Sequence, residues 1–60
     1  VPSDPKQALA IGIEAEKDSI LLYHELYQAL PPGEIRDFVS KLLREEKLHL
    51  VELRNYLEEM

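Results

Sequence analysis

The sequence predicts an all-α fold, a two-helix antiparallel hairpin, and three observations lead to it. All four prolines (Pro2, Pro5, Pro31 and Pro32) lie where helices are expected to begin or end, because a proline inside a helix costs about 3 kcal/mol. The two uninterrupted blocks between them carry apolar residues every three or four positions, which is the helical period. No alternating run of β-branched residues indicates a strand. We expect one domain over residues 1–60.

The first helix is expected over about residues 5–30 and the second over about residues 34–60, with a turn at 31–33. Asp4 can cap the first helix, Pro5 suits its first position, and Gln7 would complete a capping box. Glu34 and Asp37 place negative charge at the start of the second helix, where it interacts favourably with the helix dipole.

Length and composition exclude several classes of protein. A domain of 60 residues is marginally stable without a disulfide, a metal or a partner, and the absence of cysteine excludes disulfides and thiolate metal sites. The net charge of −5 disfavours nucleic-acid binding. No apolar run approaches the roughly 20 residues that a membrane span needs. We expect a cytoplasmic protein that has neither a nucleic-acid partner nor a membrane partner.

A seam of apolar residues runs along each predicted helix and is interrupted by three ionisable residues, Glu16, Glu46 and His49. If the turn is centred between Pro32 and Gly33, residue numbers that lie at one height sum to about 65. Glu16 then lies level with His49, so all three interruptions meet near the middle of the hairpin. The seams are Leu9, Ile13, Glu16, Ile20, Tyr23, Tyr27 and Leu30, and Ile35, Val39, Leu42, Glu46, His49, Leu53, Tyr56 and Met60.

Three interpretations of this cluster are open. Glu16 and His49 could form a buried ion pair with Glu46 bonded nearby, and such a pair often contributes little net stability. One or more of the three could instead lie at the rim, in water. We favour a metal site, because Glu46 and His49 stand three residues apart and project to the same side of one helix. Two hairpins together offer four carboxylates and two imidazoles, which is the ligand set of a di-iron or di-manganese carboxylate centre.

These residues resemble the ferritin-like superfamily, in particular its rubrerythrin-like branch, over nearly all of the chain. Residues 13–23 are similar to the first-helix pattern of that family, a ligand Glu followed seven residues later by Tyr, and residues 42–50 are similar to its Glu-Glu-x-x-His segment. The resemblance implies that Glu16, Glu46 and His49 are metal ligands and that Tyr23 is the tyrosine that hydrogen-bonds near the metals.

The same resemblance implies a ferritin-like four-helix bundle, formed here by a homodimer because the chain supplies one hairpin where the family usually supplies two. It implies two iron ions per dimer, with manganese or zinc as alternatives, and iron(II), dioxygen or hydrogen peroxide as substrates. The rubredoxin module of rubrerythrins needs cysteine, so a peroxidase would here need an external electron donor. The enzyme would be an oxidoreductase of the ferroxidase or peroxidase type.

Two other functions remain open, an assembly module whose polar layer sets the register of packing, and metal storage without catalysis. Apolar stripes beside each seam indicate that each helix can pack against more than one partner helix. Leu21, Leu48 and Val51 lie off the seams and could support a larger homo-oligomer. Gly12 lies inside the first helix and is expected to permit a close approach of the second helix or to leave room near the metals. The stripes are Ala8, Ala15, Leu22 and Ala29, and Leu43, Leu50 and Leu57.

Overall fold

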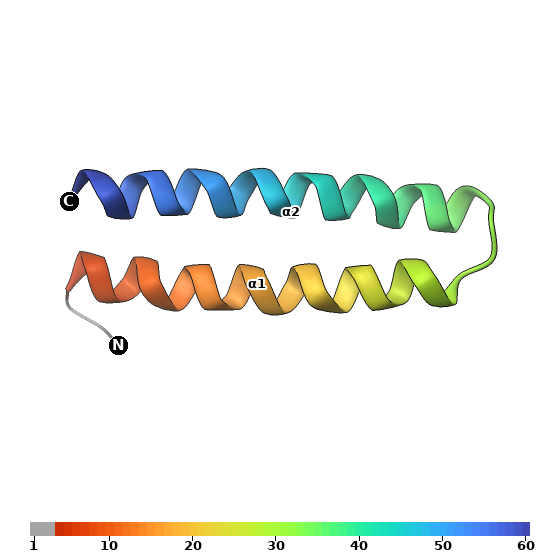
Figure 1. Cartoon of the computed structure of the whole chain (residues 1–60), viewed down its shortest axis with the longest axis horizontal. Coiled ribbons are helices and arrows are strands. Elements are labelled where there is room, and N and C mark those ends of the chain that lie inside the picture. Colours follow the sequence, from red (N-terminus) through yellow and green to blue (C-terminus); the bar gives the residue numbers. More distant parts are fainter. Residues whose placement is uncertain (1–3) are drawn as a thin grey trace.

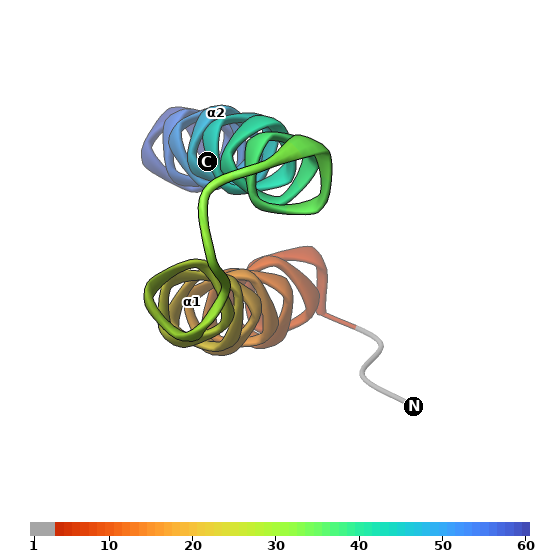
Figure 2. The ribbon, with the colours of Figure 1, turned by 90° about the vertical axis from the view of Figure 1, so that its right-hand side faces the viewer.

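The computed structural model describes residues 4–60, which form an antiparallel pair of helices (Figure 1). Helix α1 covers Pro5–Ala29 and helix α2 covers Glu34–Glu59, so each helix ends one residue before its predicted end. No strand occurs within the described range, and the predicted all-α hairpin is confirmed. Pro2 lies outside the described residues. Seen from the turn, the two helix axes are inclined to each other (Figure 2).

The first turn of α1 is capped as the sequence predicts, with one difference. The Asp4 carboxylate accepts a hydrogen bond from the Lys6 amide at 3.0 Å, and Pro5 occupies the first turn. A capping box would instead join the Asp4 side chain to the Gln7 amide. The Asp4 side chain therefore satisfies one of the amide groups that have no partner within the helix, but it is the amide of Lys6 and not that of Gln7.

The turn between the helices is held by Arg36 and by the backbone of Gly33. Arg36 Nε donates a hydrogen bond to the Tyr27 carbonyl at 3.1 Å, and its guanidinium lies 4.1 Å from the centre of the Tyr27 ring. Arg36 thus pairs with one of the last carbonyls of α1, where a cation also interacts favourably with the helix dipole. Gly33 has φ 156° and ψ −173°, a region that is essentially restricted to glycine.

The hairpin buries few side chains. Ile13 and Val39 are the two buried hydrophobic residues of the described chain, and each belongs to a predicted seam. On α2, however, the seam prediction is wrong in part, since Ile35, Tyr56 and Met60 are exposed. The half-buried residues there include the predicted flanking stripe, Leu43, Leu50 and Leu57.

The physical reason is that the apolar sector of α2 is wider than the strip that α1 can cover. One helix covers only part of such a sector, and the sequence alone does not say which edge faces the neighbour. In the structure α1 covers the edge that carries Val39, Leu43, Leu50 and Leu57, and the other edge remains open.

Gly12 lies at the level of Leu53, which agrees with the predicted register. A Cβ atom built on Gly12 would lie 3.8 Å from Leu53 Cδ1, an ordinary van der Waals distance. A methyl group at position 12 would therefore fit against α2, and the approach of the two helices within one hairpin does not require glycine there.

Within residues 4–60, neither helix combines the length and the apolar character needed to cross a membrane.

Candidate metal centre

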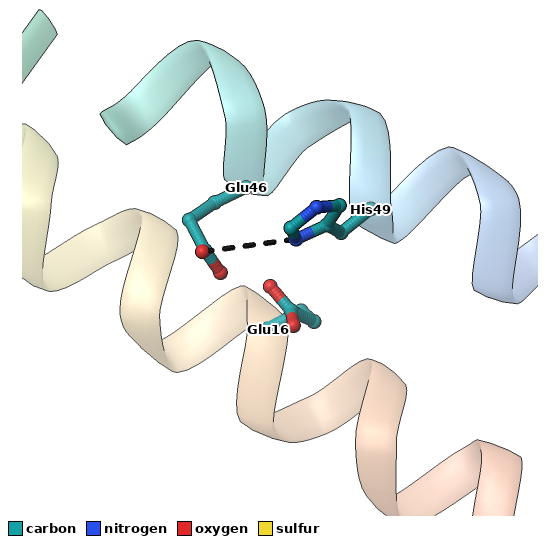
Figure 3. Close-up of side chains that lie close together, drawn as sticks. All are labelled: Glu16, Glu46 and His49. Carbon is teal, nitrogen blue, oxygen red and sulfur yellow. Dashed lines mark ion pairs between the residues drawn. The ribbon is translucent and has the colours of Figure 1, made fainter. Parts of the chain in front are cut away.

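The structure brings together the three ionisable side chains that interrupt the seams. Glu16 extends from the middle of α1, and Glu46 and His49 extend from consecutive turns of α2 toward it (Figure 3). One potential ligand atom from each residue can be chosen so that all three lie within 4.8 Å of one another. The predicted proximity therefore holds, while the role of these residues as ligands stays a prediction.

The three side chains differ in their exposure to solvent. Glu16 and Glu46 are half-buried between the helices, and the Glu46 side chain keeps 22% of its surface. The His49 side chain keeps 55% and lies at the edge of the cluster. Its Nδ1 atom is 3.8 Å from Glu46 Oε1, which is too long for a hydrogen bond and makes an ion pair only if His49 is protonated.

One atom of the cluster lacks any partner. Glu16 Oε2 is buried and accepts no hydrogen bond. A buried polar atom without a partner costs about 1–3 kcal/mol, more if it is charged, so such an atom in a folded protein needs an explanation. A cation held jointly by Glu16, Glu46 and His49 would pair with this oxygen. Carboxylate and imidazole donors suit divalent iron, manganese and zinc.

The electrostatics of the cluster agree with this explanation. The pKa of Glu16 lies above its ordinary value of 4.5, first because its protonated carboxyl can donate a hydrogen bond to the Glu46 carboxylate, and then because of burial and the negative charge of Glu46. His49 opposes the shift and lowers the pKa of Glu16. Two carboxylates that meet in a partly dry space favour the neutral form of one of them, and a divalent cation would reverse that preference.

The remaining predicted site residue, Tyr23, lies on the face of α1 that packs against α2 and is half-buried. It stands two helical turns from Glu16 on that face. Its proposed role near the metals stays a prediction.

An apolar face, which sequence reasoning missed as a unit, borders the cluster. On α1 the exposed apolar residues Leu22 and Leu26 lie on the same side as the flanking alanines, roughly 70–110° around the helix from the residues that face α2. On α2 the exposed Ile35, Phe38 and Tyr56 lie on the same side as His49.

These two stripes lie on one side of the hairpin. On each helix, rotation about the axis in the direction of the chain meets the stripe before it meets the residues that face the other helix. The two helices run in opposite directions (Figure 1), so the sense of this rotation is reversed between them. The helices also face each other from opposite sides, and the two reversals together place both stripes on the same side of the hairpin. We call this surface the apolar face; it comprises Ala8, Ala15, Leu22, Leu26 and Ala29 of α1 and Ile35, Phe38, Leu42, His49 and Tyr56 of α2.

Comparisons with protein families, with characterised proteins and with solved structures give no match to this chain. The resemblance to the ferritin-like superfamily therefore stays a prediction that depends on the residues quoted for it.

Proposed function

We propose that two copies of the hairpin pair through their apolar faces into a four-helix bundle, and that Glu16, Glu46 and His49 of both chains hold two divalent metal ions between them. The observation that carries the proposal is the buried Glu16 Oε2, which has no protein partner and belongs to a carboxylate that lies close to two further potential ligand side chains. Iron is the metal we propose, with manganese or zinc as alternatives.

The second chain would complete the site. A single hairpin supplies two carboxylates and one imidazole, and His49 leaves its other side open on the apolar face. The pairing of two such faces would surround the metals with four carboxylates and two imidazoles and would exclude water from the middle of the bundle. The hairpin's small core, with two buried hydrophobic residues, supports the need for a partner.

We propose that the reaction is the oxidation of iron(II). Iron bound as substrate supplies one electron per ion, so that two ions reduce one hydrogen peroxide with two protons to two waters, or one dioxygen with two protons to hydrogen peroxide. Glu46 and His49 of α2 and Glu16 of α1 would hold the ions, because their side chains extend toward one another (Figure 3). Turnover as a peroxidase would need an external electron donor.

The test of this function combines metal content with the rate of iron(II) oxidation. We expect two metal ions per dimer by elemental analysis and oxidation faster than the buffer background with dioxygen or peroxide. Glu46→Ala should abolish most of the rate while helicity is kept, because alanine favours helix. His49→Ala should weaken metal binding, and Tyr23→Phe should bind metal normally with a mildly lower rate.

Two results would redirect the function. Stable metal binding without oxidation above background would favour storage. Protein that binds none of the three metals would favour an assembly module, whose polar layer fixes the register of the bundle.

The dimer has a separate test with a matched control. Phe38 and Leu48 are equally exposed, at 60% and 59%, but Phe38 lies on the apolar face and Leu48 does not. Burial of a Phe side chain removes about 150–250 Å² from water. Burial of the exposed part of Phe38 in the dimer interface should therefore stabilise the dimer by on the order of 2–3 kcal/mol per chain. Phe38→Ser should weaken the dimer at least about a hundredfold in sedimentation equilibrium, and Leu48→Ser should leave it intact. A parent protein that stays monomeric at micromolar concentration would contradict the dimer.

A further inference from the structure

Two exposed strips of opposite charge lie outside the apolar face, one on each helix. The acidic strip on α1 consists of Glu14, Asp18, Leu21 and Glu25, and the basic strip on α2 consists of Arg44, Lys47, Val51 and Arg54. Each strip covers a sector of only about 60–80° of its helix, given 3.6 residues per turn. Each therefore presents a narrow row of side chains to solvent.

The two strips match in order and in spacing. Each contains two charged residues, then an apolar residue, then a third charged residue. The apolar members are largely exposed, Leu21 at 59% and Val51 at 54%. Counted from the first residue of each strip, the positions agree to within one residue, which is about 1.5 Å along a helix.

The strips cannot pair within one hairpin. α1 and α2 run antiparallel (Figure 1), and the helical period places the exposed acidic strip on the side of α1 that faces away from α2. Across residues 4–60 the ion pairs are Lys17 with Glu14 and His49 with Glu46, and neither joins the strips. The Lys17–Glu14 pair is solvent-exposed and therefore weak, so Glu14 stays open to another partner.

We propose that the acidic strip of one copy docks in parallel against the basic strip of another copy. Laid parallel, the strips oppose Glu14 to Arg44, Asp18 to Lys47, Leu21 to Val51 and Glu25 to Arg54. Laid antiparallel, only the two outer pairs stay complementary, because Asp18 meets Val51 and Leu21 meets Lys47. The parallel arrangement is therefore the one that both charge and apolar contact favour.

The contact joins different surfaces of the two copies, so one copy keeps its basic strip free and the other copy keeps its acidic strip free. Such a contact builds a closed ring if its rotation closes and a filament if it does not. Both strips lie outside the apolar face, so the contact can form whether or not the hairpin first pairs through that face. The inference is thus independent of the proposed metal site.

The contact should be sensitive to salt, unlike association through the apolar face. Exposed ion pairs are individually weak and are screened as the ionic strength rises from about 0.05 M to about 0.5 M. Sedimentation velocity of the parent protein should show, at low salt, a species that is larger than the one at high salt. A mass that is independent of salt would overturn the inference.

Charge variants test the pairing itself. Asp18→Lys and Lys47→Asp should each weaken the low-salt association about tenfold or more, because like charges then oppose each other. The double variant that carries both changes should recover the parent behaviour, and so should an equimolar mixture of the two single variants. Failure of both recoveries would refute the contact.

A matched control separates the strip from a general effect of charge. Lys41 is exposed on the same helix but lies about 100° around it from the basic strip. Lys41→Asp changes the net charge by the same amount as Lys47→Asp and should leave the low-salt species unchanged. An equal loss in both variants would show that net charge, not the strip, controls the association.

Discussion

Replacement of Glu16 by Gln separates the role of this residue in folding from its role in metal binding. Gln has nearly the same shape, but its amide can donate a hydrogen bond to Glu46, and it carries no charge. The buried Glu16 Oε2 has no partner, and the pKa of Glu16 is raised by the hydrogen bond that its protonated form can donate to Glu46, by burial and by the charge of Glu46. The metal-free protein should therefore become more stable.

The size of the effect follows from the contacts at this site. Removal of the charge from a half-buried carboxyl that has one unpartnered oxygen, together with gain of one hydrogen bond to Glu46, should stabilise the metal-free protein by about 1–2 kcal/mol near neutral pH. For a chain of this size that is a rise in melting temperature of roughly 4–16 °C. Circular dichroism melts measure it, and Glu14→Gln is the matched control, because the Glu14 side chain is 72% exposed and lies on the same helix.

The dependence on pH has a definite sign. A carboxyl whose folded pKa is raised contributes stability that is present below its unfolded pKa and is lost as the pH rises through the folded pKa. The metal-free parent should therefore lose stability as the pH rises from the ordinary value of 4.5 through the raised pKa of Glu16. Glu16→Gln should reduce that loss, and Glu14→Gln should not.

Metal addition should reverse the order of stability. Iron(II), manganese(II) or zinc(II) should raise the melting temperature of the parent by mass action, and should raise that of Glu16→Gln much less, because a neutral amide is a poor ligand for these ions. A metal-free Glu16→Gln protein that is less stable than the parent would refute the electrostatic reasoning. Equal stabilisation of both proteins by metal would refute the role of Glu16 as a ligand.

Two further predictions concern the backbone and the turn, and all are measured as free energies of unfolding in urea. Gly12→Ala should stabilise the hairpin by up to about 1 kcal/mol, because the added methyl group has room and alanine favours helix. Gly33→Ala should destabilise it by about 1–3 kcal/mol, because the backbone there has a φ of 156°. Equal effects at the two glycines would contradict this. Arg36→Met should cost about 2 kcal/mol by removing the hydrogen bond and the ring contact with Tyr27, and Arg44→Met, on an exposed position, should cost little.

The sequence was sufficient for the helices and for their register. Pro5, Pro31 and Pro32 limit the helices because proline cannot donate the backbone hydrogen bond of a helix interior, and this constraint is local. A short turn then fixes which residues share a height, and Glu16, Glu46 and His49 meet as a consequence. The proposed metal, the dimer and the reaction do not follow from these local constraints and stay predictions.

Tertiary structure decided which side of α2 faces α1 and which polar groups find a hydrogen-bond partner. The sequence marks a wide apolar sector on α2, but the choice of the edge with Leu50 over the edge with Tyr56 depends on how two whole helix surfaces pack. The cap from Arg36 to the Tyr27 carbonyl joins the ends of two helices across the turn, a contact that helical periodicity does not contain. The missing partner of Glu16 Oε2 is likewise a three-dimensional property, because satisfaction of a buried oxygen depends on every donor around it.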